Sequence, residues 1–324
     1  MQNKGRLKFY ENHSLSLVST FGIGGRARVF VIPKDTETFT DTVRLASKYG
    51  RYAVIGNASN LLFDDKGFFG TVISTVNLRA VGILTKPRLC EDNAVLKKSG
   101  EKRVIKADCG VMLPILAAFA LKNAFTGFEG LCSVPATVGG AIFMNASAYG
   151  TEISDKLIAY EIYCAEEDEK RLVFADKSAF SYRKSPIGKN GEILLCAYFK
   201  AEAGDTEQIK ARMEQCKGFR AASQPIGERS AGSFFKRPNV SDPQSPFFEK
   251  SAGELIDLCG LKGTCVGGAA VSQKHANFIV NKGGATASDV RSLADKIKKT
   301  VHKRFGIMLC EEVEYVQRYG KSIK

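Results

Sequence analysis

The sequence reads Pro135-Ala136-Thr137-Val138-Gly139-Gly140-Ala141, and shortly afterwards Asn145-Ala146-Ser147-Ala148-Tyr149-Gly150, at its most unusual stretch. These small side chains contribute little to a hydrophobic core, but they let the backbone approach a bound group closely. Backbone N–H groups exposed in turns also form concavities that bind anions. The stretch therefore predicts a loop-built site for an anionic ligand.

A second loop of small and polar residues lies upstream, at Gly56-Asn57-Ala58-Ser59-Asn60. It follows an apolar strand pattern at 27–32, a helix pattern at 36–48 and a second strand pattern at 52–55. This strand–helix–strand order predicts a small βαβ unit that presents its loop to a ligand.

The rest of the chain predicts a mixed α+β protein. Strands are expected at 104–108, 157–164, 171–174, 192–199, 278–281 and 312–316, and helices at 113–123, 206–217, 252–258 and from Thr286 onward. Residues 79–103 are polar and irregular and are expected to form a connection or a surface hairpin. The proline-containing segment 219–248 is expected to lead into a separate domain, and the strand at 312–316 could return to the first sheet.

Composition excludes several classes of protein. The 324 residues are enough for about two domains, and 44% apolar residues can fill their cores. The longest apolar stretches are far shorter than the roughly 18 to 20 residues of a membrane span, and the N-terminus offers no signal-peptide core. Nine scattered cysteines without a Cys-x-x-Cys pair, and three histidines outside zinc spacing, predict reduced thiols and no metal site. We therefore expect a cytoplasmic protein.

The net charge of +13 favours an anionic partner, either a nucleic acid or a phosphorylated metabolite. The basic residues are spread along the chain, and no nucleic-acid-binding motif is present. A Walker A motif and a Gly-x-Gly-x-x-Gly turn are also absent from the sequence, so any nucleotide would be bound by another fold.

Six motifs occur in the order found in the UDP-N-acetylenolpyruvoylglucosamine reductase (MurB) family, which this chain resembles over roughly residues 12–316. They are Thr20-Phe21-Gly22-Ile23-Gly24-Gly25, the loop from Gly56 to Leu62, the run from Pro135 to Gly150, Tyr182-Arg183-Lys184-Ser185, Gly232-Ser233-Phe234-Phe235-Lys236, and the segment from Lys274 to Asn281. The short distance from Ser185 to the next strand resembles the shorter, second subclass of the family.

The resemblance implies a vanillyl-alcohol-oxidase/PCMH-like FAD-binding fold of two subdomains, followed by an α+β substrate-binding domain. The expected segments are 1–78 together with 313–324, then 79–218, then 219–312. It also implies that NADPH reduces FAD and that flavin N5 then delivers hydride to the vinyl carbon of UDP-N-acetylglucosamine enolpyruvate. The product would be UDP-N-acetylmuramate for peptidoglycan synthesis.

The implied partners are the UDP-sugar and NADPH, with no nucleic acid, no membrane insertion and a monomeric state. Another flavin-dependent oxidoreductase of the same fold and a basic nucleic-acid-binding protein are the alternatives.

Carried onto this sequence, the family's motifs imply three groups of site residues. FAD would be bound by Gly56, Asn57, Ala58, Ser59, Asn60, Pro135, Thr137, Gly139, Gly140, Asn145, Ala148 and Gly150. The substrate would be bound by Tyr182, Lys236 and Lys262, and catalysis would use Arg183, Ser233 and Glu312. Hydride addition pushes negative charge onto the substrate carboxylate, which the planar guanidinium of Arg183 can hold with two parallel hydrogen bonds. Ser233 would donate the proton to the other alkene carbon.

Two departures from the family pattern raise questions for the structure. The closing motif reads Leu309-Cys310-Glu311-Glu312-Val313, with cysteine in place of a glutamate, so Glu311 is the alternative to Glu312 as the active-site carboxylate. Ala58 and Ala136 stand where the family usually has glycine, so these loops either use angles that alanine allows or bind the cofactor less tightly. For His275, a structural hydrogen bond is at least as good an explanation as catalysis.

Overall fold

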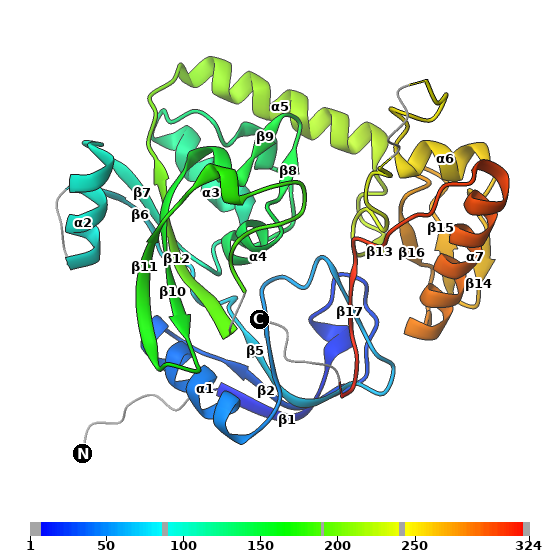
Figure 1. The fold of residues 1–324 in the computed structure, drawn as a ribbon, viewed down its shortest axis with the longest axis horizontal. Coiled ribbons are helices and arrows are strands. Elements are labelled where there is room, and N and C mark those ends of the chain that lie inside the picture. The colour runs from blue at the N-terminus through cyan, green and yellow to red at the C-terminus, as the bar shows by residue number, and fades with distance from the viewer. Residues whose placement is uncertain (1–7, 86–89, 189–190, 240–243, 320–324) are drawn as a thin grey trace.

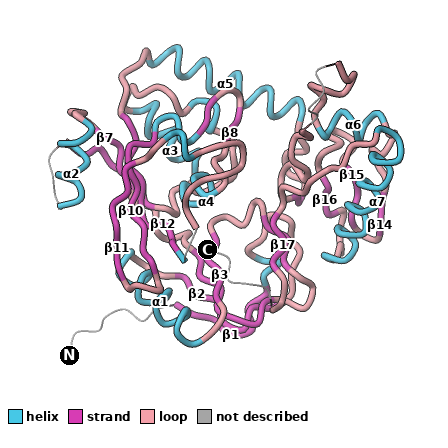
Figure 2. Tube along the Cα trace, in the orientation of Figure 1, coloured by secondary structure: helices cyan, strands magenta, loops and turns pink. Residues whose placement is uncertain are grey.

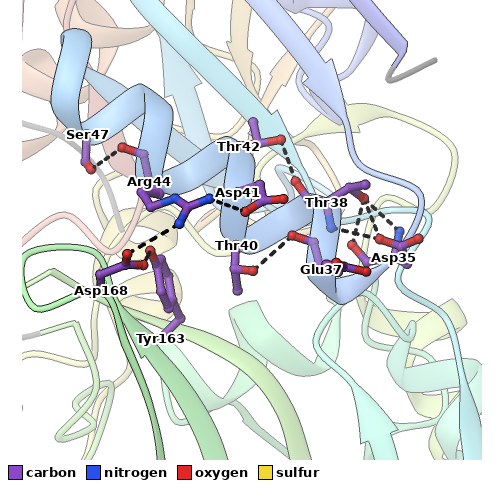
Figure 3. Close-up of polar contacts among 10 residues, drawn as sticks. All are labelled: Asp35, Glu37, Thr38, Thr40, Asp41, Thr42, Arg44, Ser47, Tyr163 and Asp168. Carbon is purple, nitrogen blue, oxygen red and sulfur yellow. Dashed lines mark hydrogen bonds and ion pairs between the residues drawn. The ribbon is translucent and has the colours of Figure 1, made fainter. Parts of the chain in front are cut away.

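The computed structural model describes residues 8–85, 90–188, 191–239 and 244–319. Its first sheet has the strand order β1-β2-β5-β3, in which β1 is antiparallel to β2 while β2 and β3 both run parallel to β5. The elements are β1 (Lys8–Ser14), β2 (Arg26–Ile32), β3 (Tyr52–Ile55), β5 (Phe68–Ser74), the helix α1 (Thr36–Tyr49) and the short helix η1 (Leu15–Leu17). The predicted strand–helix–strand unit is confirmed, and α1 starts at a capping box formed by Asp35 and Thr38 (Figure 3).

A second, antiparallel sheet has the order β11-β10-β12-β7-β6. Its strands are β6 (Val81–Leu84), β7 (Val104–Asp108), β10 (Leu157–Cys164), β11 (Glu169–Phe174) and β12 (Glu192–Lys200). The sheet lies between α2 (Cys90–Ser99) on one side and α3 (Leu113–Lys122) and α4 (Val138–Phe143) on the other (Figure 2). The glycine-rich run holds β8 (Ser147–Ala148). It is preceded by η2 (Glu129–Leu131) and followed by β9 (Thr151–Glu152) and η3 (Ile153–Lys156), and η4 (Lys177–Ala179) follows β11.

The prediction of an irregular connection at 79–103 was wrong, because this segment forms β6 and α2. Acidic residues begin α2 and lysines end it, which suits the helix dipole. Two inward-facing side chains attach the helix to the sheet: Val95 is fully buried, and Asp92 accepts a hydrogen bond from the Tyr198 hydroxyl at 3.0 Å. The apolar contacts of α2 come from the adjacent residues Val95 and Leu96, which give no helical periodicity in the sequence.

The third group of elements is a small sheet, β13-β16-β15-β14, with α6 and α7 (Figure 1). Its members are β13 (Arg229–Ser230), α6 (Ala252–Leu258), β14 (Cys265–Val266), β15 (Ala269–Val271), β16 (Ile279–Asn281) and α7 (Ala287–Phe305). The predicted stripe of Val290, Leu293, Ala294, Ile297 and Val301 on α7 is fully buried, which confirms it as core.

Two connections join this group to the rest. Helix α5 (Thr206–Ser223) runs across from the second sheet to the third group (Figure 1), so the predicted boundary at residue 218 falls inside a continuous helix. The chain returns through β17 (Glu314–Val316), which pairs in parallel with β4 (Leu61–Phe63). This return was expected in the first sheet, but the two strands form a separate pair directly after the 56–60 loop. Residues 1–7 and 320–324 of the expected segments lie outside the described residues.

The first and second groups share a hydrophobic core. Phe39 and Val43 of α1 pack in the same cluster as Leu113 and Leu116 of α3. At the surface, Arg44 of α1 reaches Asp168 at 3.4 Å, and Asp168 accepts a hydrogen bond from Tyr163 at 2.6 Å (Figure 3). The third group has its own core around α6 and α7, which also takes in Phe21 and Leu62.

Candidate active site

A cavity of about 470 Å³ lies where the three groups of elements meet. This volume falls in the range of small-molecule and cofactor sites, roughly 300 to 1,000 Å³. Its walls come from residues 54–61, from the glycine-rich run, from the end of α5, and from the segments that carry Ser233 and Glu312. Ten of the twelve predicted cofactor residues line it: Gly56, Asn57, Ala58, Ser59, Asn60, Pro135, Thr137, Gly139, Gly140 and Ala148. Asn145 and Gly150 do not.

The two predicted loops touch across this cavity. The Asn57 amide donates to the Pro135 carbonyl at 2.9 Å, and a Cβ at Gly56 would collide with the hydroxyl of Thr137. Thr137 in turn caps α4, since its hydroxyl accepts from the Gly140 N–H at 3.3 Å. A glycine is therefore required at position 56 for the loops to close together.

The 56–60 loop carries free hydrogen-bond donors. Among the described residues, none of its five backbone N–H groups has a protein acceptor. Buried or half-buried amides normally find a partner, so unpaired N–H groups along a cavity wall point to a ligand rich in acceptor oxygens. The diphosphate of a dinucleotide has that chemistry, and these residues therefore fit FAD.

The two alanines that replace the family's glycines behave differently. Ala58 has φ +48°, in the left-handed region, whereas Ala136 is not among the residues with positive φ. The expected conflict between alanine and a positive φ is therefore real at position 58 only. The loop keeps its left-handed shape there despite the methyl group.

Arg183 projects from a tight turn. Ser181 and Lys184 bond to each other through their backbones at 2.9 and 3.1 Å, and Arg183 between them has φ +55°. Asn145, fully buried, supports this turn by donating to the Ser181 carbonyl at 3.1 Å. The guanidinium donates to Ser147 Oγ at 3.1 Å and forms an ion pair with Glu312. Asn145 thus supports the turn that carries Arg183 and does not itself line the cavity.

Of the two adjacent glutamates, Glu312 is the one at the cavity. Its backbone N–H donates to the Phe234 carbonyl at 2.8 Å, and its carbonyl accepts from the Asn60 amide at 3.0 Å. Burial raises the pKa of the Glu312 carboxyl, while the nearby Arg183 charge opposes that rise. Glu311 instead pairs with Lys298 at 2.7 Å, away from the cavity.

Ser233 lines the same cavity from a loop that Asn277 holds. The Asn277 carbonyl accepts from Phe234 N–H at 2.7 Å, its side-chain Oδ1 accepts from Phe235 N–H at 2.9 Å, and its amide donates to the Phe235 carbonyl at 2.8 Å. The backbone N–H of Glu312 donates to the carbonyl of Phe234, the residue after Ser233. This hydrogen bond fixes the positions of Ser233 and Glu312 relative to each other. The three predicted catalytic residues therefore meet at one cavity.

The three predicted substrate residues lie apart. Lys236 lines a neighbouring cavity of about 370 Å³, which shares Arg183 with the first one. Tyr182 lies outside both cavities, and its hydroxyl accepts from Arg237 N–H at 3.2 Å. Lys262 also lies outside both and pairs with Asp257 at 2.7 Å. Burial lowers the pKa of His275, and its Nδ1 accepts a structural hydrogen bond from Asn277 N–H at 3.2 Å.

Several site residues had not been predicted. Ser147, Tyr149, Arg220 and Gln224 line the cavity, and Asn277 holds the Ser233 loop. Arg220 and Gln224 lie at the end of α5, which was expected to finish at residue 217, so no local pattern marked them. Within the part of the chain that the structure describes, no group of three His, Cys, Asp or Glu residues could hold a metal. None of the helices described there is long and apolar enough to cross a membrane.

Comparisons with known proteins agree over nearly the whole chain. Residues 27–172 match a family model described as FAD binding domain, and residues 224–316 match UDP-N-acetylenolpyruvoylglucosamine reductase, C-terminal domain. The UDP-N-acetylenolpyruvoylglucosamine reductase of Caldicellulosiruptor bescii is 36% identical over 98% of this chain and 94% of its own length. That of Bacillus licheniformis is 36% identical over 95% and 94%. The crystal structure of the Thermus caldophilus enzyme superposes with a TM-score of 0.74 at 30% identity, covering 96% of this chain and 99% of that one.

Proposed function

The chain belongs to the UDP-N-acetylenolpyruvoylglucosamine reductase family of flavin oxidoreductases, and we propose that it uses NADPH and FAD to reduce UDP-N-acetylglucosamine enolpyruvate to UDP-N-acetylmuramate. The match of the C-terminal domain supports this family over other flavin-dependent oxidoreductases. The observation that carries the proposal is the convergence of Arg183, Ser233 and Glu312 on one cavity beside the free amides of residues 56–60. Cytoplasmic location and a monomeric state stay predictions.

Residues 56–60 and 135–140 would hold the cofactor. The unpaired N–H groups of the first loop supply donors for its diphosphate, and the small side chains of both loops leave room for it. When bound, FAD would supply the redox chemistry, a hydride transfer from NADPH to the vinyl carbon of the substrate.

Arg183 would stabilise the charge that develops on the substrate. Hydride addition at the carbon beta to the carboxylate drives negative charge onto that carboxylate. Glu312 and Ser147 hold the guanidinium in the cavity, so it is oriented before the substrate arrives. Preorientation of this kind removes the cost of reorganising the cation during the reaction.

Ser233 would donate the proton that the neighbouring alkene carbon needs. A hydroxyl is a weak acid in water, but the carbanionic carbon is a strong base, so a short and well-positioned donor suffices. The Asn277 hydrogen bonds on both sides of Phe235 hold the loop that positions this hydroxyl.

Anaerobic stopped-flow spectroscopy of the separate half-reactions tests the proposal. Wild-type protein should be yellow, NADPH should bleach its flavin absorbance, and the enolpyruvyl substrate should restore it. Ser233→Ala should be reduced at the wild-type rate but reoxidised about 10²- to 10⁴-fold more slowly. Arg183→Lys should also slow the second half-reaction.

Ser230→Ala is the matched control, because Ser230 lies in the same segment but does not line the cavity. Equal slowing of both half-reactions in Ser233→Ala would reject Ser233 as the acid. A colourless protein whose stability does not change with added FAD would reject flavin chemistry altogether.

A further inference from the structure

Arg220 lies near the end of α5, where this helix passes from the second sheet to the third group of elements. Its half-buried side chain lines the cavity. Among the described residues, the cations that line this cavity are Arg183 and Arg220, and Arg183 is already paired with Glu312. In the described structure, the Arg220 guanidinium has neither a carboxylate within ion-pair distance nor a hydrogen-bond acceptor.

An arginine that is removed from water without a partner is costly to the fold. Burial lowers the pKa of Arg220, and the groups that act against that effect among the described residues are Tyr149 and Cys132, not a carboxylate. A buried cation is usually paired in a native protein, so an unpaired one beside a cavity indicates that a ligand completes the pairing.

Two other side chains in the cavity wall also carry a polar atom without a hydrogen-bond partner. The hydroxyl of Tyr149 and the Oε1 atom of Gln224 are buried without a hydrogen-bond partner among the described residues, and both residues line the cavity. Gln224 follows Arg220 by one helical turn, and the charge of Arg220 acts on the Tyr149 hydroxyl. Three incompletely paired polar groups therefore share one wall.

The chemistry of these groups suits phosphate oxygens. A guanidinium presents a planar fork of N–H donors, and a phenol presents one O–H donor. The oxygen and nitrogen of a glutamine amide are exchangeable by a flip, so Gln224 can also present N–H donors. A carboxylate ligand is less favoured, because Arg183 already serves that chemistry in the proposed reaction.

We propose that Arg220, Tyr149 and Gln224 form a diphosphate clamp at the end of α5. This inference rests on the proposed function, in which both FAD and the UDP-sugar bring a diphosphate into the cavity. The clamp binds the diphosphate of one of these two molecules.

Binding measurements on the full-length chain distinguish the two sources. FAD is titrated into flavin-free protein by flavin fluorescence, and UDP is titrated into FAD-loaded protein by the change in flavin absorbance. Arg220→Gln should weaken one of the two affinities by about 10- to 100-fold, and Arg220→Lys should weaken it less. A loss for FAD assigns the cofactor's diphosphate, and a loss for UDP assigns the substrate's.

Lys210→Gln is the matched control, since Lys210 is exposed on the same helix and carries the same charge. Its affinities should equal those of the wild type. Unchanged affinities for both ligands in Arg220→Gln would overturn the clamp. Thermal unfolding without ligand adds a second readout: Arg220→Gln should be at least as stable as wild type, because an unpaired cation is removed, whereas a structural role would lower its stability.

The clamp and the proposed function fail in different ways. Wild-type protein that binds FAD and UDP but shows no turnover contradicts the function and leaves the clamp measurable. Wild-type turnover together with unchanged binding in Arg220→Gln contradicts the clamp alone.

Discussion

Ala58, Tyr149, Arg183 and Gly232 all line the cavity, and all have positive φ angles between +48° and +77°. For the three that are not glycine, this region costs roughly 1 to 2 kcal/mol each. Such angles persist only where surrounding contacts determine them, and they concentrate at functional sites. The cavity wall is therefore built from backbone that the fold holds in an unfavourable shape.

Ala58→Gly should change the free energy of unfolding by less than about 1 kcal/mol. The substitution relieves the left-handed strain but removes a buried methyl group, worth about 0.8 kcal/mol, and adds freedom to the unfolded chain. Ala53→Gly is the control: Ala53 is fully buried in β3 of the same core and has no strain to relieve. It should lose about 1 to 2 kcal/mol. Chemical denaturation measures both, and equal losses would contradict the strain at Ala58.

Asn277→Ala should destabilise the chain and slow the proton-transfer step together. It leaves the Phe235 N–H and carbonyl without partners, at about 1 to 3 kcal/mol for each buried group. The Ser233 loop loses its support at the same time. Asn277→Asp keeps the Oδ1 acceptor but sets a carboxylate oxygen, which cannot donate, against the Phe235 carbonyl, so it should also lose stability. Denaturation and reoxidation kinetics are the measurements, and an unaltered reoxidation rate in Asn277→Ala would show that Ser233 does not depend on this residue.

Helices α1, α6 and α7 were predictable because each begins with a capping box. Helix α7 also buries a regular stripe of apolar side chains. Helices α2 and α4 were not, because α2 buries only a few side chains and α4 has six residues. Helix α3 has no side-chain cap and was predicted from its Ala- and Leu-rich sequence, so either a cap or a continuous apolar run makes a helix predictable here.

Thr286→Ala should lower the free energy of unfolding by about 1 kcal/mol, the usual cost of losing an N-cap hydroxyl. The Thr286 side chain accepts from the Asp289 N–H at 3.0 Å. Thr300→Ala on the same helix is the control, because its hydroxyl bonds only to the Lys296 carbonyl within the helix. It should be neutral or slightly stabilising. Equal effects at both positions would show that the cap does not contribute.

Asp289→Asn should cost stability at pH 7 and progressively less as the pH falls below about 4. The backbone and side chain of Thr286 hold the pKa of the Asp289 carboxyl below its ordinary value. Stability from a lowered pKa is present above the ordinary pKa and is lost as the pH falls through the folded-state value. Denaturation of both proteins between pH 7 and pH 3 measures the difference. A difference that does not shrink with acid would contradict this origin.

The two largest clusters of buried side chains among the described residues divide the structure into two parts. The first and second groups of elements share one cluster of buried side chains, and the third group has another. The cavity lies where these parts meet, and α5 and β17 are the connections between them. The residues proposed for catalysis therefore come from both parts: Arg183 from one, Ser233 from the other.

Leu116→Ala and Leu293→Ala should each lower the stability of a different part. Both side chains are buried, Leu116 in the shared core and Leu293 in the core of the third group. Each loss should be about 2 to 5 kcal/mol. Calorimetry should resolve two transitions, with each substitution lowering one of them. Identical shifts of a single transition would show that the two cores unfold as one unit.

Local chemistry was enough to predict the βαβ unit, the capped helices and the two small-residue loops, and the order of motifs identified the family. These features depend on residues that are neighbours along the chain, so the local sequence alone contains their periodicity and turn preferences. The tertiary structure decided the rest: the pairing of β17 with β4, the placement of Glu312 rather than Glu311 at the cavity, the left-handed angle of Ala58 and the unpaired state of Arg220. Each of these depends on packing between segments that are distant in the chain. The Asn60 amide, for example, donates to the carbonyl of Glu312, which lies 252 positions later. No local sequence pattern encodes such a contact.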